Sequence, residues 1–147
     1  MKILMPVAVH LILHDRQTDK LLLSRRYKTG YEDGNYSVVS GHVEKHETVT
    51  EAMVREAKEE IGIKLDEANL EFIRVIHRHS GQDERIDFFF YATKWDGNVQ
   101  NMEPEKCDQL LWSYVNDLPF NVIPYVRDTI HTMDQKGYSS YGWNKKV

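Results

Sequence analysis

GHVEKHETVTEAMVREAKEEIGI, residues 41–63, is the stretch of sequence that decides the fold of this chain. Thr48 is followed three residues later by Glu51, which is a capping-box pattern, so a helix is predicted to begin at Thr48 or Val49. Gly62 stands where a C-capping glycine belongs. The stretch therefore predicts a loop, a helix and a second loop.

The predicted helix has two unlike faces. Apolar residues recur every four positions, at Val49, Met53, Ala57 and Ile61. That spacing predicts an amphipathic helix whose apolar face packs against a sheet. The opposite face carries one cation and three acids, Arg55, Glu56, Glu59 and Glu60.

The three glutamates are the strongest chemical signal in the chain. Glu56, Glu59 and Glu60 are separated by three and four residues, so their carboxylates project from one face of the helix. Each like-charged pair costs an isolated helix about 0.2–0.5 kcal/mol, and a hard divalent cation with oxygen ligands would offset that cost. The alternative is a solvated helix face, which is where charged residues are usually found. The pattern predicts a site for Mg²⁺ or Mn²⁺.

The same stretch carries a family signature. Seven residues stand at the spacings of the Nudix box, namely Gly41, Glu47, Arg55, Glu56, Glu59, Glu60 and Gly62. The chain therefore resembles the Nudix hydrolases. The resemblance implies an α/β fold, an α/β/α sandwich with a mixed sheet between helices, and hydrolysis of a nucleoside diphosphate that is linked to another group.

The resemblance also implies roles for individual residues. Arg55 would orient the glutamates, Glu56 and Glu59 would act in catalysis, and Glu56, Glu59 and Glu60 would be metal ligands. The backbone carbonyl of Ser40 would reach the metal as well, although the usual Gly-Gly pair is Ser40-Gly41 here.

Two short segments are predicted to contact the substrate. Glycine permits positive φ and close approach of the backbone to a ligand, so Gly41 and the adjacent His42 are assigned to substrate binding. Arg25 and Arg26 end an apolar run and could meet phosphate, unless they belong to an ordinary polar loop.

A further acid is expected downstream of the box. The segment around Glu103 and Glu105, which leads to Trp112, resembles the corresponding region of MutT-like Nudix enzymes. There an acidic residue completes the metal site or serves as the catalytic base. Glu103 and Glu105 both remain candidates.

Periodicity and turn residues predict a mixed α/β order. Strands are expected at 3–14, 20–26, 37–40, 70–78, 86–95 and 109–115, and helices at 48–61 and 122–136. The aromatic strand 86–95 should lie centrally in the sheet, because it is apolar on both faces. We expect the loop 28–36 to cover a ligand and the tail 137–147 to be loosely ordered.

A nucleobase pocket is a weaker expectation. His77 and His79 face the same side of their predicted strand and could line such a pocket with Tyr31, Phe89 or Trp95, because aromatic faces stack on bases. The segment 80–85 could gate it.

Composition limits the class of protein. The 147 residues are predicted to form a single domain over 1–147, because 41% apolar and 29% charged residues are ordinary for a globular chain. A net charge of −4 and the lack of a long basic cluster argue against a nucleic-acid polymer as partner. No apolar run approaches the roughly 20 residues of a membrane span. The N-terminus reads as a strand without a signal cleavage site, and Cys107 is the single cysteine, so we expect a cytoplasmic monomer or small oligomer such as a homodimer.

Two classes of function follow. The first is a metal-dependent pyrophosphohydrolase, whose substrate is expected to be a nucleoside triphosphate that yields monophosphate and pyrophosphate. A nucleotide sugar or ADP-ribose is the alternative substrate. The second class is a nucleotide-sensing binding module without turnover, which would be expected to have lost a box carboxylate, and this chain retains them all.

Overall fold

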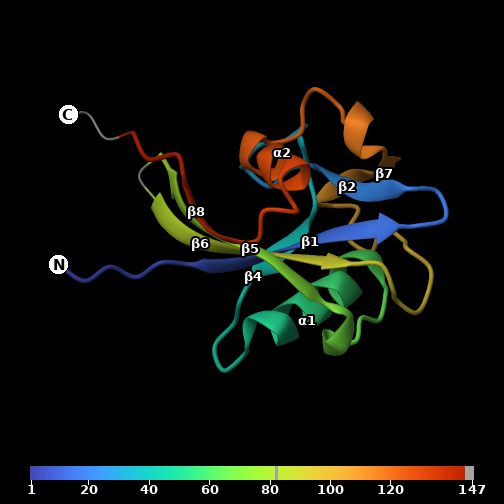
Figure 1. The fold of residues 1–147 in the computed structure, drawn as a ribbon, viewed down its shortest axis with the longest axis horizontal. Coiled ribbons are helices and arrows are strands. Elements are labelled where there is room, and N and C mark those ends of the chain that lie inside the picture. Colours follow the sequence, from blue (N-terminus) through green and yellow to red (C-terminus); the bar gives the residue numbers. More distant parts are fainter. Residues whose placement is uncertain (82, 145–147) are drawn as a thin grey trace.

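A computed structural model describes residues 1–81 and 83–144 (Figure 1). The strands are β1 (Val7–Asp15), β2 (Lys20–Arg26), β3 (Tyr36–Ser37), β4 (Val39–His42), β5 (Glu71–Ser80), β6 (Asp83–Ala92), β7 (Cys107–Ser113) and β8 (Gly137–Tyr141). The helices are α1 (Val49–Ile61) and α2 (Pro124–His131), with short 3₁₀ turns at Glu67–Asn69 and Val115–Asp117. The predicted α/β class is confirmed.

The strands form one mixed sheet in the order β3-β2-β1-β6-β5-β8, to which β4 is added beside β1 and β7 beside β2. β1 runs parallel to β6 and β5 runs parallel to β8, while the other pairs are antiparallel. The aromatic strand β6 lies between β1 and β5, as its two apolar faces predicted.

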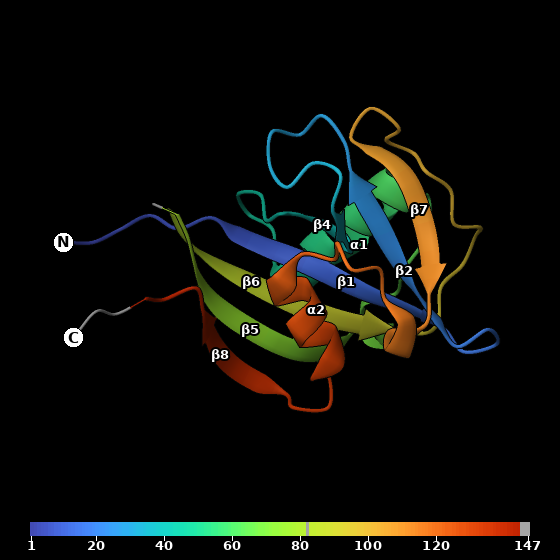
Figure 2. The same cartoon turned by 90° about the horizontal axis from the view of Figure 1, so that it is seen from above.

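The sheet divides beside β1. β1 pairs with β2 only at its end, where His14 lies opposite Leu21, and it pairs with β4 from Ala8 to Leu11. Figure 2 shows β2 and β7 diverging from β1 and β6 beyond this point. The divergence leaves room for a cleft at β4.

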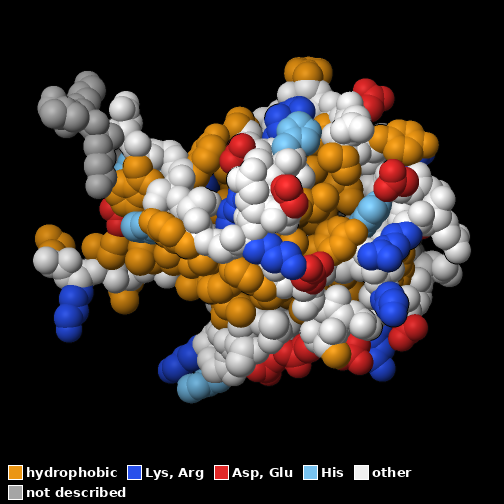
Figure 3. All heavy atoms as spheres, in the orientation of Figure 1, with side chains coloured by type: hydrophobic (Ala, Val, Ile, Leu, Met, Phe, Trp, Pro, Cys, Tyr) orange, Lys and Arg blue, Asp and Glu red, His pale blue; other side chains and the backbone are white. Residues whose placement is uncertain are grey.

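Each face of the sheet carries its own core. Side chains alternate along β1, so Val9, Leu11 and Leu13 pack with the apolar face of α1, whereas Ile12 packs with α2. Figure 1 shows the two helices on opposite faces of the sheet, which confirms the sandwich. Acidic side chains gather over the outer face of α1 (Figure 3). In the two described ranges, no helix is both long and apolar enough to cross a membrane.

The predicted ends of α1 are confirmed. The Thr48 side chain accepts a hydrogen bond from the backbone N–H of Glu51, and the Glu51 side chain accepts one from the N–H of Thr48. Gly62 adopts a left-handed conformation with φ of 72°, and its N–H donates to the carbonyl of Lys58. The helix thus begins and ends where its own sequence dictates.

The second helix is shorter than predicted. It ends at His131 instead of residue 136. The buried guanidinium of Arg74 donates to the carbonyls of Thr132 and Gln135, at 2.8 and 2.7 Å, and so satisfies carbonyls that follow the helix. This partner comes from β5, 58 positions away from Thr132, so no local pattern signals it.

Two expectations about loops are wrong. Residues 137–141 of the expected loose tail form β8, because the outer edge of β5 offers backbone groups that a further strand can pair. Most of the expected gate at 80–85 is strand: β5 continues to Ser80 and β6 begins at Asp83. Gln82 and residues 145–147 lie outside the described residues.

Candidate active site

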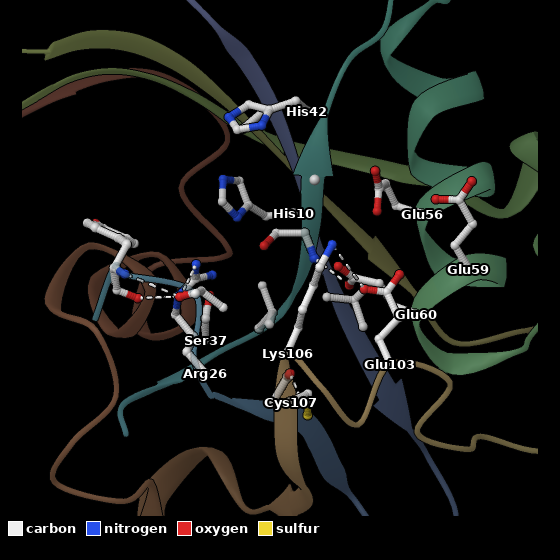
Figure 4. Close-up of a pocket in the computed structure, with 18 of the residues that line it drawn as sticks. His10, Arg26, Ser37, His42, Glu56, Glu59, Glu60, Glu103, Lys106 and Cys107 are labelled. Carbon is white, nitrogen blue, oxygen red and sulfur yellow. Dashed lines mark hydrogen bonds and ion pairs between the residues drawn. The ribbon is translucent and has the colours of Figure 1, made fainter. Parts of the chain in front are cut away.

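A cleft of about 680 Å³ opens beside β4 (Figure 4). Residues of α1, β1, β2, β4, β5, β6 and the loop before β7 line it. The sequence-predicted residues that line it are Arg26, Tyr31, Ser40, Gly41, His42, Arg55, Glu56, Glu59, Glu60 and Glu103. Two other candidates, Arg25 and Glu105, are not among the lining residues.

Arg55 connects the acids of the box. Its Nε and Nη2 donate to the two carboxylate oxygens of Glu47 at 2.7 and 2.9 Å. Its Nη1 donates to Glu56 at 2.8 Å and to Glu59 at 3.2 Å. A planar guanidinium suits such paired contacts, so Arg55 holds the acids in fixed positions.

The Arg55–Glu47 pair is the anchor of this arrangement. The hydrogen bond from Arg55 lowers the pKa of Glu47 to about 2, and the same bond raises the pKa of Arg55. Both groups are therefore charged over the whole physiological range. Glu47 supports the site from the loop before α1, as the resemblance implied.

The negative charges of Glu60 and Glu56 are only partly balanced by nearby positive charge and hydrogen-bond donors. Desolvation raises the pKa of Glu60 well above its usual range, and the negative charge of Glu56 adds to the rise. A hydrogen bond from the N–H of Ser40 to Glu60 Oε2, at 3.1 Å, opposes it. Desolvation raises the pKa of Glu56 as well, although Arg55 offsets part of that effect.

Gly41 makes room for one of these acids. The Glu56 carboxyl group lies so close to the Gly41 backbone that a Cβ on Gly41 would overlap it. Gly41 belongs to β4 and is not among the glycines with positive φ. Close approach explains this glycine, therefore, and the positive φ allowed for in the sequence analysis is wrong.

The donor set fits a divalent cation. Glu56, Glu59 and Glu60 offer only oxygen ligands, which suit a hard divalent cation. Because Gly41 has no Cβ, the Glu56 carboxylate has space beside the backbone. Over residues 1–81 and 83–144, no three His, Cys, Asp or Glu side chains already converge as a metal cage. Arg55 holds Glu56 and Glu59, and Ser40 holds Glu60, so metal binding would require these carboxylates to turn.

The structure distinguishes the two downstream acids. Glu103 lines the cleft, and Lys106 lies 3.8 Å from its carboxylate, whereas Glu105 is exposed outside the cleft. The backbone N–H of Glu103 donates to the Asn101 side chain, which fixes the turn. The structure therefore does not bring Glu105 to the candidate site.

The two arginines of β2 also separate. Arg26 lines the cleft and donates to the carbonyl of Tyr31 at 2.6 Å. Arg25 pairs with Asp108 through two hydrogen bonds of 2.7 and 3.1 Å, away from the cleft. Successive side chains of a strand point to opposite faces, so the assignment of Arg25 to substrate binding is wrong.

We call the part of the cleft lined by Arg55, Glu56, Glu59, Glu60 and Glu103 the glutamate end. The part lined by His10, His42, Arg78, Arg85 and Asp87 is the histidine end. Figure 4 shows β4 between the two, with His10 and His42 on one side and the glutamates on the other.

Sequence reasoning missed most of the histidine end. Its signal was present, because His10 lies between Val9 and Leu11 and Asp87 between Ile86 and Phe88, so each is a polar residue within an apolar run. At this end, Arg85 Nη2 lies 2.6 Å from His42 Nε2, and desolvation and the charge of Arg85 lower the pKa of His42. His42 is therefore neutral near pH 7.

The expected nucleobase pocket is mostly wrong. His77 and His79 pack on the ring of Trp143, with centroids 4.7 and 5.0 Å apart, and do not line the cleft. Trp95 stacks on Trp112 instead. Of the predicted group, Tyr31 alone lines the cleft.

The chain is similar in sequence to known proteins. The sequence model of the NUDIX domain matches residues 4–133. The NAD-capped RNA hydrolases NudC of Salmonella paratyphi C and Salmonella choleraesuis are each 27% identical over 113 residues. The match covers 77% of this chain and 41% of theirs, so the chain matches about two fifths of the length of these relatives.

The chain is also similar in structure to solved proteins. The MutT NUDIX hydrolase from Burkholderia pseudomallei has a TM-score of 0.79 at 23% identity, covering 88% of this chain and 98% of that one. The MutT protein from Methanosarcina mazei Go1 has a TM-score of 0.77 at 17% identity, covering 91% and 96%. A UDP-X diphosphatase has a TM-score of 0.72 at 17% identity, covering 95% and 69%. These likenesses establish a shared fold.

Proposed function

The chain belongs to the Nudix family, and on that premise we propose that its cleft hydrolyses a nucleoside triphosphate to a monophosphate and pyrophosphate. It is a hydrolase that acts on phosphoanhydride bonds. The proposed reaction requires Mg²⁺ or Mn²⁺.

One observation carries it: Arg55 holds two glutamates at one end of a cleft that Arg26 and Lys28 also line. Acids with unsatisfied charge can take a divalent cation, while Arg26 and Lys28 can pair with the remaining phosphate oxygens. In phosphoryl transfer, fixed positive charge stabilises the charge that spreads over the oxygens of the transition state.

The glutamates and the Ser40 carbonyl would hold the metal. When bound, such an ion neutralises phosphate oxygens and lowers the pKa of water. Glu103, which lines the cleft, would accept the proton of the attacking water. Arg55 would keep its positive charge beside Glu56 and Glu59 throughout, because its hydrogen bonds to Glu47 hold the guanidinium in its charged form.

The test is a panel of substrates with purified protein. Nucleoside triphosphates, nucleotide sugars and ADP-ribose are incubated with Mg²⁺ or Mn²⁺, and the products are separated by chromatography. We expect monophosphate and pyrophosphate from triphosphates, and loss of both products when a chelator removes the metal.

Other outcomes would change the proposal. Cleavage of nucleotide sugars or ADP-ribose alone would replace the substrate class. Nucleotide binding without turnover of any member would favour the sensing module. The cytoplasmic location, the single domain and the homodimer stay predictions from the sequence.

A further inference from the structure

The histidine end contains a buried polar network. His10 and Arg78 are each 3% exposed and Asp87 is fully buried. His10 Nε2 lies 2.9 Å from Asp87 Oδ1, and Arg78 Nε donates to Asp87 Oδ2 at 2.7 Å. Burying three such groups is costly, and stability alone is a weak reason to retain them.

The network fixes the proton of His10. Burial opposes the charge on Asp87, but the hydrogen bonds from His10 and Arg78 outweigh it and hold the pKa of Asp87 below its usual range. An ionised carboxylate can only accept hydrogen bonds, so the shared proton lies on His10 Nε2. In the neutral ring, Nδ1 is then left as an acceptor.

Nδ1 has no partner within the described part of the chain, although it is buried. Most buried polar atoms are hydrogen-bonded, and an exception calls for an explanation. His10 lines the cleft, and its cross-strand neighbour on β4 is Ser40, whose N–H reaches Glu60. Because residues of both ends line one cleft, a molecule held at the glutamate end can reach His10.

The ring of His10 is held in one orientation. It stacks on Phe89 with centroids 4.5 Å apart and planes 12° apart, and it meets the edge of Tyr125. The guanidinium of Arg78 lies 4.0 Å from the centre of the Tyr125 ring. A fixed acceptor discriminates between ligands better than a mobile one, since little entropy is lost on binding.

A second atom at this end also lacks a partner. Arg85 Nε is a buried donor without a hydrogen bond among the described residues, and Arg85 lines the same cleft. The histidine end thus offers one acceptor and one donor to a ligand. Nucleosides carry both kinds of group on the base and on the sugar.

We propose that His10 is a specificity-determining residue whose Nδ1 accepts a hydrogen bond from an N–H or O–H group of the substrate's nucleoside. The inference rests on the proposed function. Asp87 and Arg78 act through His10 as positioning residues, because they fix its proton and its ring.

The test uses two replacements of His10. One is designed to keep the contact that Nε2 makes with Asp87, and the other to keep an acceptor at the position of Nδ1. His10→Gln keeps a polar atom near the position of Nε2, toward Asp87, and loses Nδ1. His10→Asn keeps a polar atom near the position of Nδ1 and loses the contact with Asp87. His14→Gln is the matched control, because His14 lies on the same strand but does not line the cleft.

Two measurements are made on each variant: kcat and KM for pyrophosphate release, and calorimetric affinity for the monophosphate product without metal. For His10→Gln we expect about a tenfold loss in kcat/KM and a similar loss in affinity, with the melting temperature nearly unchanged. His10→Asn should melt earlier yet keep more of the affinity. His14→Gln should leave both constants unchanged.

The substrate panel distinguishes the two sources of the donor. If the donor is on the base, the loss in His10→Gln varies among bases and is the same for ribose and 2′-deoxyribose. If it is a sugar hydroxyl, the loss vanishes with the 2′-deoxy or the 3′-deoxy analogue, whichever lacks that hydroxyl, and is equal for all bases. Unchanged affinity in His10→Gln, or losses that only follow melting temperature, would overturn the inference. Affinity is measured without turnover, so this result is separate from a failure of the proposed hydrolysis.

Discussion

At the glutamate end of the cleft, Arg55, Glu56, Glu59 and Glu60 come from two turns of α1, whereas at the histidine end His10 and Asp87 are 77 positions apart. Desolvation and repulsion leave Glu60 with a raised pKa, while Asp87 has two close donors and a lowered one. The glutamate end therefore has negative charge that its neighbours do not fully balance. At the histidine end, the charged groups pair with one another. One cleft thus holds a part whose unbalanced charges cost stability and a part whose charges are stable only as a unit.

Replacing Glu60 should have the largest effect and should separate activity from stability. Glu60→Gln removes a proposed metal ligand, so we expect turnover to fall by about 10³-fold. Because the change also removes a desolvated charge beside Glu56, the melting temperature should hold or rise. Steady-state kinetics and thermal unfolding measure the two effects.

The control for this change is Glu105→Gln, since Glu105 is exposed outside the cleft. Normal turnover in Glu60→Gln would remove Glu60 from the proposed mechanism. A collapse of stability would contradict the view that this end trades stability for function.

Replacing Asp87 tests the other end. Asp87→Asn leaves the Arg78 charge buried without its partner, and we expect it to destabilise the protein by about 3 kcal/mol. Urea unfolding gives the free-energy difference. A loss below about 1 kcal/mol would mean that the network at the histidine end does not behave as a unit.

Gly41 lies on β4 between the two ends, and its replacement should have an intermediate effect. Gly41→Ala places a Cβ against the Glu56 carboxyl, so we expect about 1–2 kcal/mol of destabilisation. The matched experiment is the double variant with Glu56→Ala, in which the overlap is gone. If Gly41→Ala costs the same in both backgrounds, as unfolding midpoints would show, Glu56 is not the reason for glycine at this position.

The smallest effect is expected from acid at the Arg55–Glu47 pair. The pKa of Glu47 in the folded protein, about 2, lies below its ordinary value of 4.5, so the pair contributes fully above pH 4.5 and loses its contribution as pH falls toward 2. The stability difference between wild type and Glu47→Gln should therefore shrink between pH 6 and pH 3. A difference that is constant with pH would show that the pair does not set this pKa, and Glu105→Gln serves as the baseline.

Much of the glutamate end could be predicted from the sequence. Thr48 and Gly62 define α1 through contacts with residues three or four positions away, and the same helical spacing brings Glu56, Glu59 and Glu60 to one face. The choice between Glu103 and Glu105 could not be made, because it depends on how the turn before β7 docks against α1. Arg25 was misplaced for a related reason: strand alternation fixes that two neighbours diverge and leaves open which one meets the cleft.

By itself, then, the sequence determined the Nudix box, the helix that presents it and the family, because all three depend on short-range spacing along one segment. The tertiary structure alone decided that His10 and Arg78 both pair with Asp87, that Arg26 enters the cleft and that β8 completes the sheet. Those contacts depend on the register between strands that are distant in the chain. Such register is set by the packing of whole faces of the sheet, which no local pattern contains.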